Sequence, residues 1–223
     1  MKLVQTDMGL AIDIMENIIP LICVESPHVM TQMIAELYSQ INGNEGNFVL
    51  SEDKTISFAK GVELLINPWA IDGNSKKIKA GLLQLVKESI EEDCYEKYME
   101  VRGGILSLAE QIAENVPYSI TYNEDPDISL LAKLLDFSIA FEETGLLQRL
   151  VEYMKLSMKM CGTKLFFLVN VRSFLEEEEL ELLLQEVMLH KITMIMLESH
   201  VPQKTFASEK VVIIDKDGCI ITV

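Results

Sequence analysis

The chain is predicted to be an α/β protein with a parallel sheet at its core, and a strand–helix–strand unit in its last third is the main reason. Residues 164–170 form an almost unbroken apolar run, typical of a strand buried on both faces of a parallel sheet. Ser173 and Glu176 match a capping box, which opens a helix that ends near Lys191. A second apolar strand follows at 192–197, so the three elements form a crossover unit.

The usual chemistry of this architecture is absent from the sequence. Nucleotide-binding proteins with such a core carry a glycine-rich loop that wraps phosphate, and neither G-x-x-x-x-G-K-[ST] nor G-x-G-x-x-G occurs here. The core lacks a Walker A motif and is therefore expected to serve a purpose other than NTP hydrolysis.

The N-terminal elements are short strands around one helix. A hairpin is expected at residues 2–5 and 10–14, because Asp7-Met8-Gly9 is a turn sequence. Pro20 interrupts the next strand, at 18–24, and so favours an edge strand or a strand start. Ser26-Pro27 opens a helix that Gly43 stops, and strands are expected at 47–50 and 62–66.

A long helical block separates these elements from the C-terminal ones. Ser75 starts a helix that runs to about Glu91, and a second helix runs from Asp93 to Glu114, with a bend or break at Gly103-Gly104. We therefore expect a sheet domain at 1–74 and 117–223 and a helical extension at 75–116. The remaining predicted elements are a short strand at 119–122, helices at 128–135 and 145–160, and a terminal hairpin at 211–214 and 219–223.

The composition is that of a folded, cytoplasmic protein without a membrane association. Apolar residues make up 49% and charged residues 24%, and the apolar runs are far shorter than the roughly 20 residues of a membrane span. The N-terminus lacks the apolar core of a signal peptide. The cysteines are expected to be mostly buried free thiols, since no two are close in sequence: Cys23, Cys94, Cys161 and Cys219.

The net charge is −16, with 19 basic and 35 acidic residues, which by itself argues against nucleic-acid binding. The average hides a sorted distribution, because what matters is where the positive charge lies. Six of the basic residues fall in one segment, at Lys76, Lys77, Lys79, Lys87, Lys97 and Arg102.

Four of these lysines lie on the predicted helix that starts at Ser75. Lys76 and Lys87 project within about 20° of each other, with Lys79 beside them and Lys77 on the other flank. Lysines along one border of an amphipathic helix could follow a phosphate backbone. The alternative is a solvated face whose lysines pair with neighbouring glutamates of the same helix.

Glu124, Asp125 and Asp127 crowd around a proline turn, with the Asn123 carbonyl nearby. Hard oxygen ligands at this density suit Ca²⁺, although the spacing is not that of an EF-hand. The alternative is an exposed acidic loop in which Asp127 caps the next helix. The histidines form no zinc pattern, and no serine or cysteine has the context of a catalytic nucleophile.

Several segments together resemble one family, the small ring-forming adaptation protein of type II-A CRISPR systems, the Csn-two family. Residues 164–170 resemble its K-L-L-I-F-x-N strand, and Met194-Ile195-Met196-Leu197-Glu198 resembles its V-L-F-L-E strand. The strand at 64–66, followed by Asp72-x-Asn74-Ser75 and a helix, is similar to the family's strand, turn and first long helix.

The resemblance implies a P-loop-like head domain with helical legs, and a non-catalytic protein that acts in spacer acquisition. It implies a homotetrameric ring whose hole takes linear double-stranded DNA from an end, without base readout, and which Ca²⁺ stabilises. The adaptation integrase complex and the RNA-guided effector nuclease are the implied partners. Lys76, Lys77, Lys79 and Lys87 fall in the helix associated with the hole, and Glu124, Asp125 and Asp127 in the calcium-associated loop.

Two other functions remain open at this point. One is a divergent nucleotide-binding ATPase, because Asn170 and Glu198 follow buried strands at the sheet edge where α/β proteins bind ligands. The other is a DNA-independent protein scaffold.

Overall fold

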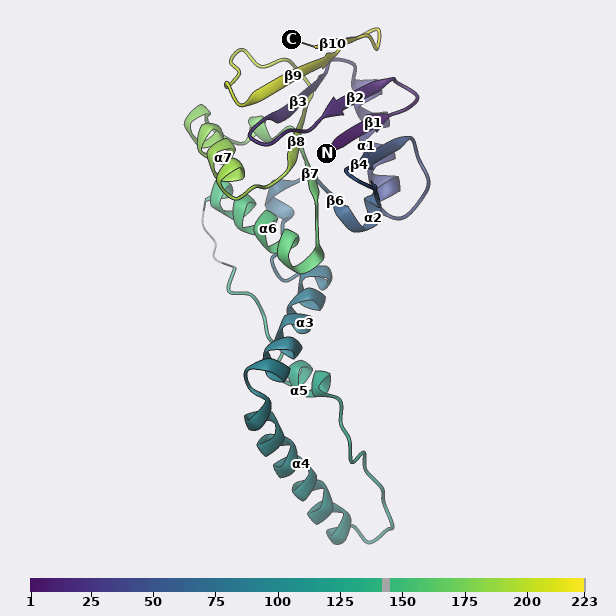
Figure 1. The fold of residues 1–223 in the computed structure, drawn as a ribbon, viewed down its shortest axis with the longest axis vertical. Coiled ribbons are helices and arrows are strands. Elements are labelled where there is room, and N and C mark those ends of the chain that lie inside the picture. Colours follow the sequence, from purple (N-terminus) through teal and green to yellow (C-terminus); the bar gives the residue numbers. More distant parts are fainter. Residues whose placement is uncertain (142–144, 223) are drawn as a thin grey trace. The chain divides into compact units, whose positions relative to one another are not determined.

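A computed structural model describes residues 1–141 and 145–222 and divides the chain into two compact units (Figure 1). The first unit holds Met1–Gly73 with Phe141–Val223, and the second holds Asn74–Ala140. Residues 117–140, which the sequence analysis placed with the sheet domain, thus cluster with the helical block at 75–116. The reason is packing, since helix α5 at 128–134 contacts helix α3 at 76–92.

The first unit is built on a six-stranded sheet with the order β10-β9-β3-β8-β7-β6, which confirms the mixed α/β class. All neighbouring strands are parallel except the edge strand β10, which runs antiparallel to β9. The expected crossover unit is present, as β7, α7 (Glu177–Leu189) and β8. The strands are β3 (Ile19–Val24), β6 (Val62–Leu65), β7 (Leu165–Val169), β8 (Met194–Glu198), β9 (Glu209–Ile214) and β10 (Ile220–Thr222).

Pro20 does not mark an edge strand, because β3 lies between β8 and β9. The pairing with β8 starts only at Leu21, so Pro20 lies at the beginning of the strand. Proline is tolerated at the first residues of a strand. Of the two predictions for Pro20, the strand start is therefore the correct one.

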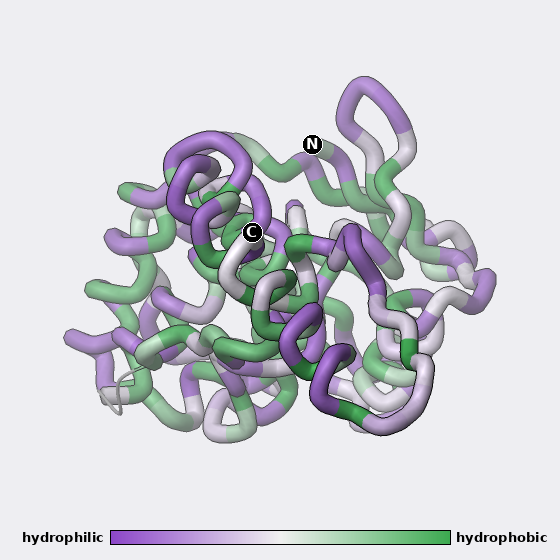
Figure 2. The backbone as a smooth tube through the Cα atoms, turned by 90° about the horizontal axis from the view of Figure 1, so that it is seen from below, coloured by the Kyte–Doolittle hydropathy of each residue, from purple (hydrophilic) through white to green (hydrophobic). Residues whose placement is uncertain are grey.

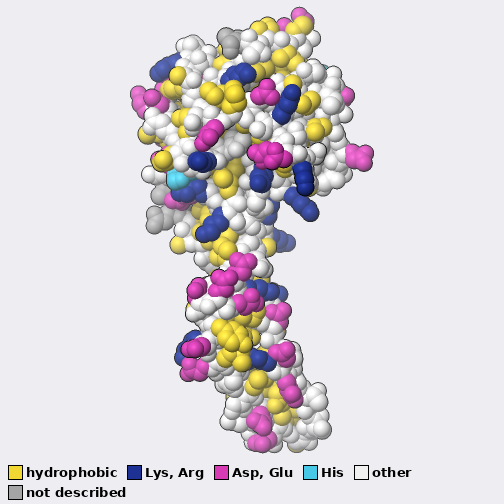
Figure 3. Space-filling model, viewed as in Figure 1, with side chains coloured by type: hydrophobic (Ala, Val, Ile, Leu, Met, Phe, Trp, Pro, Cys, Tyr) yellow, Lys and Arg dark blue, Asp and Glu magenta, His cyan; other side chains and the backbone are white. Residues whose placement is uncertain are grey.

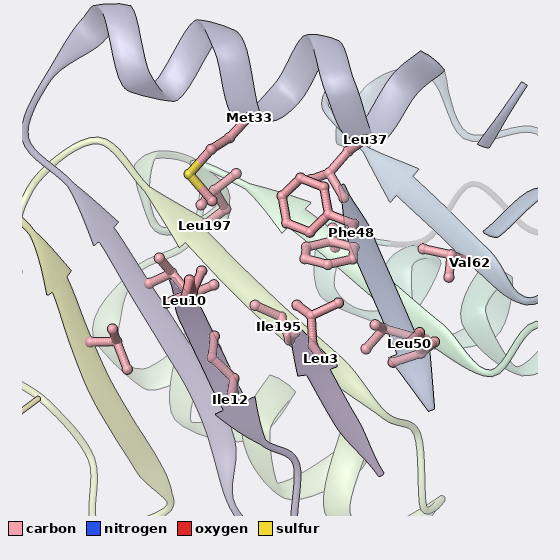
Figure 4. Close-up of a cluster of buried hydrophobic side chains, with 14 of the residues drawn as sticks. Leu3, Leu10, Ile12, Met33, Leu37, Phe48, Leu50, Val62, Ile195 and Leu197 are labelled. Carbon is pink, nitrogen blue, oxygen red and sulfur yellow. The ribbon is translucent and has the colours of Figure 1, made fainter. Parts of the chain in front are cut away.

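A four-stranded antiparallel sheet with the order β2-β1-β4-β5 packs with α1 (Pro27–Ile41) over one face of the large sheet. Met33 and Leu37 of α1 point toward this core, in which Leu3 and Phe48 of the small sheet meet Ile195 of β8 (Figure 4). The predicted N-terminal hairpin is confirmed. The strands are β1 (Lys2–Gln5), β2 (Leu10–Asp13), β4 (Phe48–Ser51) and β5 (Thr55–Ile56).

The other face of the large sheet is covered by α6 (Leu146–Cys161) and α7, which pack on each other. Adjacent strand residues are both buried, as Phe166 and Phe167 of β7 are, because the sheet has a core on each face. Shorter elements complete the unit: α2 (Phe58–Gly61) and two 3-10 turns, η1 (Pro68–Ala70) and η2 (Val171–Ser173).

The helix α7 starts later than the sequence pattern predicts. Its capping box is formed by Glu176 and Glu179, with the side chain of each accepting from the backbone N–H of the other. Ser173 belongs to η2 and caps nothing in α7, because Asn170 takes a left-handed conformation and turns the chain before the helix begins.

The second unit consists of α3 (Lys76–Glu92), α4 (Tyr95–Asn115) and α5 (Ile128–Leu134). Of the bend or break expected at Gly103-Gly104, the break is absent, because α4 runs through both glycines as one helix of 21 residues. The strand expected at 119–122 is also absent, since the chain from 116 to 127 forms no helix or strand. These residues have no neighbouring strand in their own unit with which to pair.

The cysteines are less buried than the sequence predicts. All four cysteines are free, but only Cys23 is buried, whereas Cys94 and Cys219 are exposed. Within the described residues, no helix combines the length and apolarity that a membrane span requires. Figure 2 colours the backbone by hydropathy and shows hydrophobic and hydrophilic stretches that alternate along it.

Candidate nucleic-acid interface

Asn74 and Ser75 fix the start of α3 through side-chain hydrogen bonds. The Asn74 amide donates to the Ile139 carbonyl at 3.0 Å, and its oxygen accepts from the Ile139 N–H at 2.8 Å. The Ser75 hydroxyl accepts from the Ile78 N–H at 3.5 Å, which is the bond of an N-cap. Asn74 therefore anchors the chain just before α3, and Ser75 caps the first turn, in which Lys76 and Lys77 lie.

The charge in the second unit is sharply sorted along the chain. Residues 74–87 contain four lysines and no carboxylate, whereas residues 88–127 contain eleven carboxylates and two basic residues. The start of α3 is therefore a cationic segment within a strongly acidic chain.

The four predicted lysines lie on α3 but not in equivalent surroundings. Lys76 and Lys77 are exposed in the first turn, and Lys79 and Lys87 are half-buried. Lys76 and Lys87 are about 16 Å apart along the helix axis, which corresponds to roughly five base-pair steps of duplex DNA. The helix can therefore present cations to more than one phosphate.

Lys79 and Lys87 face carboxylates outside their own helix. Lys79 Nζ lies 3.4 Å from the Asp136 carboxylate, just after α5. The pKa of Asp127 lies below its ordinary value, chiefly because Ser129 donates hydrogen bonds to it, and in part because of the positive charges of Lys87 and Lys133. Two of the four lysines thus have acidic neighbours that the sequence pattern did not reveal, because these neighbours are about 40 to 60 residues away in sequence.

The acidic loop does not gather its three carboxylates around one point. Asp125 forms an ion pair with Arg102 at 2.6 Å, and Arg102 also donates to the Glu124 carbonyl at 3.2 Å. Asp127 accepts from the Ser129 N–H at 2.7 Å in the first turn of α5. Among the described residues, no three His, Cys, Asp or Glu side chains form a group that could hold a metal ion. A guanidinium beside Asp125 also repels a cation, so the loop does not have the form of a calcium site within a single chain.

Helix α4 carries an apolar stripe that sequence analysis missed. Val101, Ile105, Leu108 and Ile112 recur at heptad spacing, all are exposed, and α4 has no buried residue at all. Figure 3 shows hydrophobic side chains gathered over α4 and α5 with acidic side chains around them. The heptad spacing was visible in the sequence, but only the structure shows that the stripe stays exposed. Val101 and Ile105 border a hollow with Leu130 of α5, which does not bury them.

Asn170 and Glu198, at the carboxyl end of the large sheet, accept hydrogen bonds from backbone N–H groups of neighbouring segments. The Asn170 side chain accepts from the Ser199 N–H at 2.9 Å, and Glu198 accepts from the Arg172 N–H at 3.2 Å. The Arg172 side chain pairs with the buried Glu209 carboxylate and donates to the Lys204 carbonyl. These contacts hold the connection from β8 to β9 against the sheet.

The connection from β3 to α1 is equally informative, because in phosphate-binding folds a glycine loop joins such a strand to its helix. Here only Glu25 and Ser26 separate β3 from α1. Pro27 begins the helix and has no N–H to offer a phosphate.

Comparison of the sequence and structure with known proteins identifies the family of this chain. No curated protein matches the sequence. Among solved structures, a bacterial Atm1-family ABC exporter with ATP bound aligns with a TM-score of 0.40 and 12% identity. The alignment covers 93% of this chain and 34% of the exporter chain, and at that score it supports no argument. The model of the CRISPR-associated protein family Cas_Csn2 matches residues 40–218, and the chain therefore belongs to this family.

Proposed function

We propose that this CRISPR-associated protein is a non-catalytic, sequence-independent ring that binds the ends of double-stranded DNA during spacer acquisition. The observation that supports this proposal most directly is the segment at 74–87, which contains four lysines and no Asp or Glu of its own in a chain of net charge −16. A helix of this kind contacts the phosphate backbone, which carries no sequence information.

A single chain has too few clustered cations for strong DNA binding, so the proposal requires self-association. A homotetramer would bring four copies of the cationic segment around one lumen, while the acidic surface outside repels DNA. The exposed apolar stripe on α4 supports self-association, because a 21-residue helix without a buried residue gains little stability by itself. The head domain would be P-loop-like in this scheme, with the second unit as its leg.

Threading from an end distinguishes a ring from an ordinary DNA-binding surface. We expect a gel-shift assay to show binding to a linear duplex and no binding to a covalently closed circle of the same length. Linearising the circle with a nuclease should restore binding. Equal affinity for the two forms would reject threading, and absence of binding to either form, with and without Ca²⁺, would reject the function.

The lysines are tested by charge reversal with a matched control. The variant Lys76→Glu/Lys79→Glu/Lys87→Glu should abolish binding, because it replaces phosphate contacts with repulsion. The control, Lys54→Glu/Lys60→Glu/Lys216→Glu, makes the same change in net charge at exposed lysines of the first unit and should retain binding. Equal loss in both variants would show that only the net charge matters.

Calcium belongs to the proposal as a ligand of the assembled protein. Isothermal titration of the wild-type protein with CaCl₂ should give heat that Glu124→Gln/Asp125→Asn reduces. Unchanged heat in the variant would place the calcium elsewhere, and no heat in the wild-type protein would remove calcium from the proposal.

The proposed partners, the adaptation integrase complex and the RNA-guided effector nuclease, are tested by co-purification with and without DNA.

The non-catalytic part of the proposal has its own test. Asn170 and Glu198, the residues considered for an ATPase, bind backbone N–H groups of neighbouring loops and are therefore occupied. Calorimetry with ATP and Mg²⁺ should give no binding heat, and a phosphate-release assay should give no turnover. Turnover that disappears in Glu198→Gln would replace the ring proposal with an enzyme.

A further inference from the structure

We propose that Lys79 of α3 and Lys133 of α5 form one phosphate subsite, and that Asp136 occupies this subsite as an internal counter-ion until DNA displaces it. The inference rests on the proposed DNA binding and adds to it a second helix, a further lysine and a built-in competitor. All the residues concerned lie in the second unit.

The subsite is a hollow between α3 and α5 with a volume of about 180 Å³. Lys79 and Lys133 come from different helices and both line it, with Asp136 at the same place. Apolar side chains form the rest of the lining, including Leu82, Leu83 and Ala132. Two lysine side chains that line one small hollow are suited to an oxyanion such as a backbone phosphate.

Asp136 is held in place by the end of α5 and not by Lys79 alone. Its N–H donates to the Lys133 carbonyl at 3.2 Å, and its backbone is left-handed, with φ of 42°. Aspartate and asparagine tolerate this conformation better than other residues with a side chain. The carboxylate is therefore positioned beside Lys79 Nζ, at 3.4 Å, by the turn that ends the helix.

The ion pair is weak enough for DNA to break. The Asp136 side chain is 83% exposed and that of Lys79 is 41% exposed, so water and salt screen their attraction. A duplex presents a row of phosphates and gains entropy by releasing condensed cations, which a single carboxylate cannot match. Asp136 should therefore reduce the affinity without preventing binding, and it should keep weaker anions out of the subsite.

The experiment measures binding of a linear duplex by fluorescence anisotropy over a series of salt concentrations. Asp136→Asn should tighten binding by about two- to five-fold per subsite, the range expected for loss of an exposed ion pair, and steepen the salt dependence. Asparagine also suits the left-handed backbone, so the variant should fold. Lys133→Gln should weaken binding and reduce the slope of log K against log salt by about 0.9 for each lost contact.

Matched controls come from a similar ion pair in the same unit, Lys97 with Glu100 at 2.6 Å on α4. Glu100→Gln and Lys97→Gln make the same changes in net charge and should leave affinity and slope within error of wild type. If Asp136→Asn tightens binding no more than Glu100→Gln, Asp136 is no competitor. If Lys133→Gln matches Lys97→Gln, Lys133 is no phosphate ligand. These outcomes reject the subsite while the wild-type protein still binds DNA, whereas a wild-type protein that binds no duplex rejects the proposed function as well.

Discussion

Glu198 is a buried carboxylate at the end of β8, and its burial raises its pKa above the ordinary value. The N–H and the positive charge of Arg172 lower the pKa again, but only in part. Because the folded protein holds this proton more tightly than the unfolded chain does, Glu198 favours folding at low pH. That contribution is lost as the pH rises through the folded-state pKa.

We therefore expect Glu198→Gln to stabilise the protein at neutral pH. The gain in the free energy of unfolding over wild type should shrink as the pH falls and disappear below the ordinary pKa of glutamate, about 4.3. Urea unfolding of both proteins between pH 4 and pH 8 measures the difference. A difference that does not change with pH would show that the ionisation of Glu198 is not costly in the folded state.

Tyr153 of α6 and Glu63 of β6 connect a helix to the edge strand of the large sheet. The Tyr153 hydroxyl and the Ser157 hydroxyl both donate to the Glu63 carboxylate, and Ser157 is within hydrogen-bond distance of Thr163, at 2.7 Å. Burial and the neighbouring carboxylate raise the pKa of Tyr153, so the phenol stays protonated and remains a donor.

Loss of the Tyr153 hydroxyl should destabilise the fold, because the Glu63 carboxylate then keeps, of these two hydrogen bonds, only the one from Ser157. We expect Tyr153→Phe to lower the free energy of unfolding by about 1 to 3 kcal/mol. Tyr38→Phe, which removes the same atom from an exposed tyrosine, should change it very little. Chemical denaturation at equal protein concentrations compares the two, and equal effects would mean that the Glu63 network contributes nothing to stability.

Helix α4 differs most from what its sequence suggests, since two adjacent glycines lie in its middle without breaking it. A Cβ atom added at Gly103 or Gly104 would meet nothing within 4 Å. Glycine in a helix interior is less favourable than alanine, because it has more conformational freedom to lose. The two glycines therefore weaken α4 without an evident benefit in a single chain.

Gly103→Ala and Gly104→Ala should each raise the free energy of unfolding by about 0.5 to 1 kcal/mol. Gly9→Ala should lower it, because Gly9 has a φ of 66° that alanine adopts only with strain. Thermal unfolding followed by circular dichroism ranks the three variants. Destabilisation by the α4 substitutions would indicate that another surface approaches the bare glycines in the assembled protein.

At the scale of the whole molecule, the central question is how an acidic protein could hold DNA. With 35 acidic and 19 basic residues, one chain offers few clustered cations, of which the four lysines at 74–87 are on a single helix, so the proposed DNA binding calls for several chains. The exposed stripe on α4 is the feature best suited to join them, because burying it removes apolar surface from water.

Ile105→Glu/Leu108→Glu should therefore reduce the mass in solution. We expect light scattering to give close to four times 25.2 kDa for the wild-type protein and a smaller assembly for the variant. Circular dichroism should show that the helices remain. Leu189→Glu, at an exposed position of α7, serves as the control and should keep the wild-type mass. A wild-type mass near one subunit would contradict the tetramer.

The sequence alone determined the α/β core, because an apolar run such as 165–169 has few environments other than a parallel sheet with helices on both faces. It also located the lysines of α3, since capping residues and helical periodicity are local signals. Contacts between distant residues were decided only by the tertiary structure. Asp136 pairs with Lys79, which is 57 residues away in sequence, and Asp125 pairs with Arg102, which is 23 residues away. The strand that contains Pro20 lies between β8 and β9. Local patterns specify which element forms, but the partner of a charged side chain depends on how the elements pack.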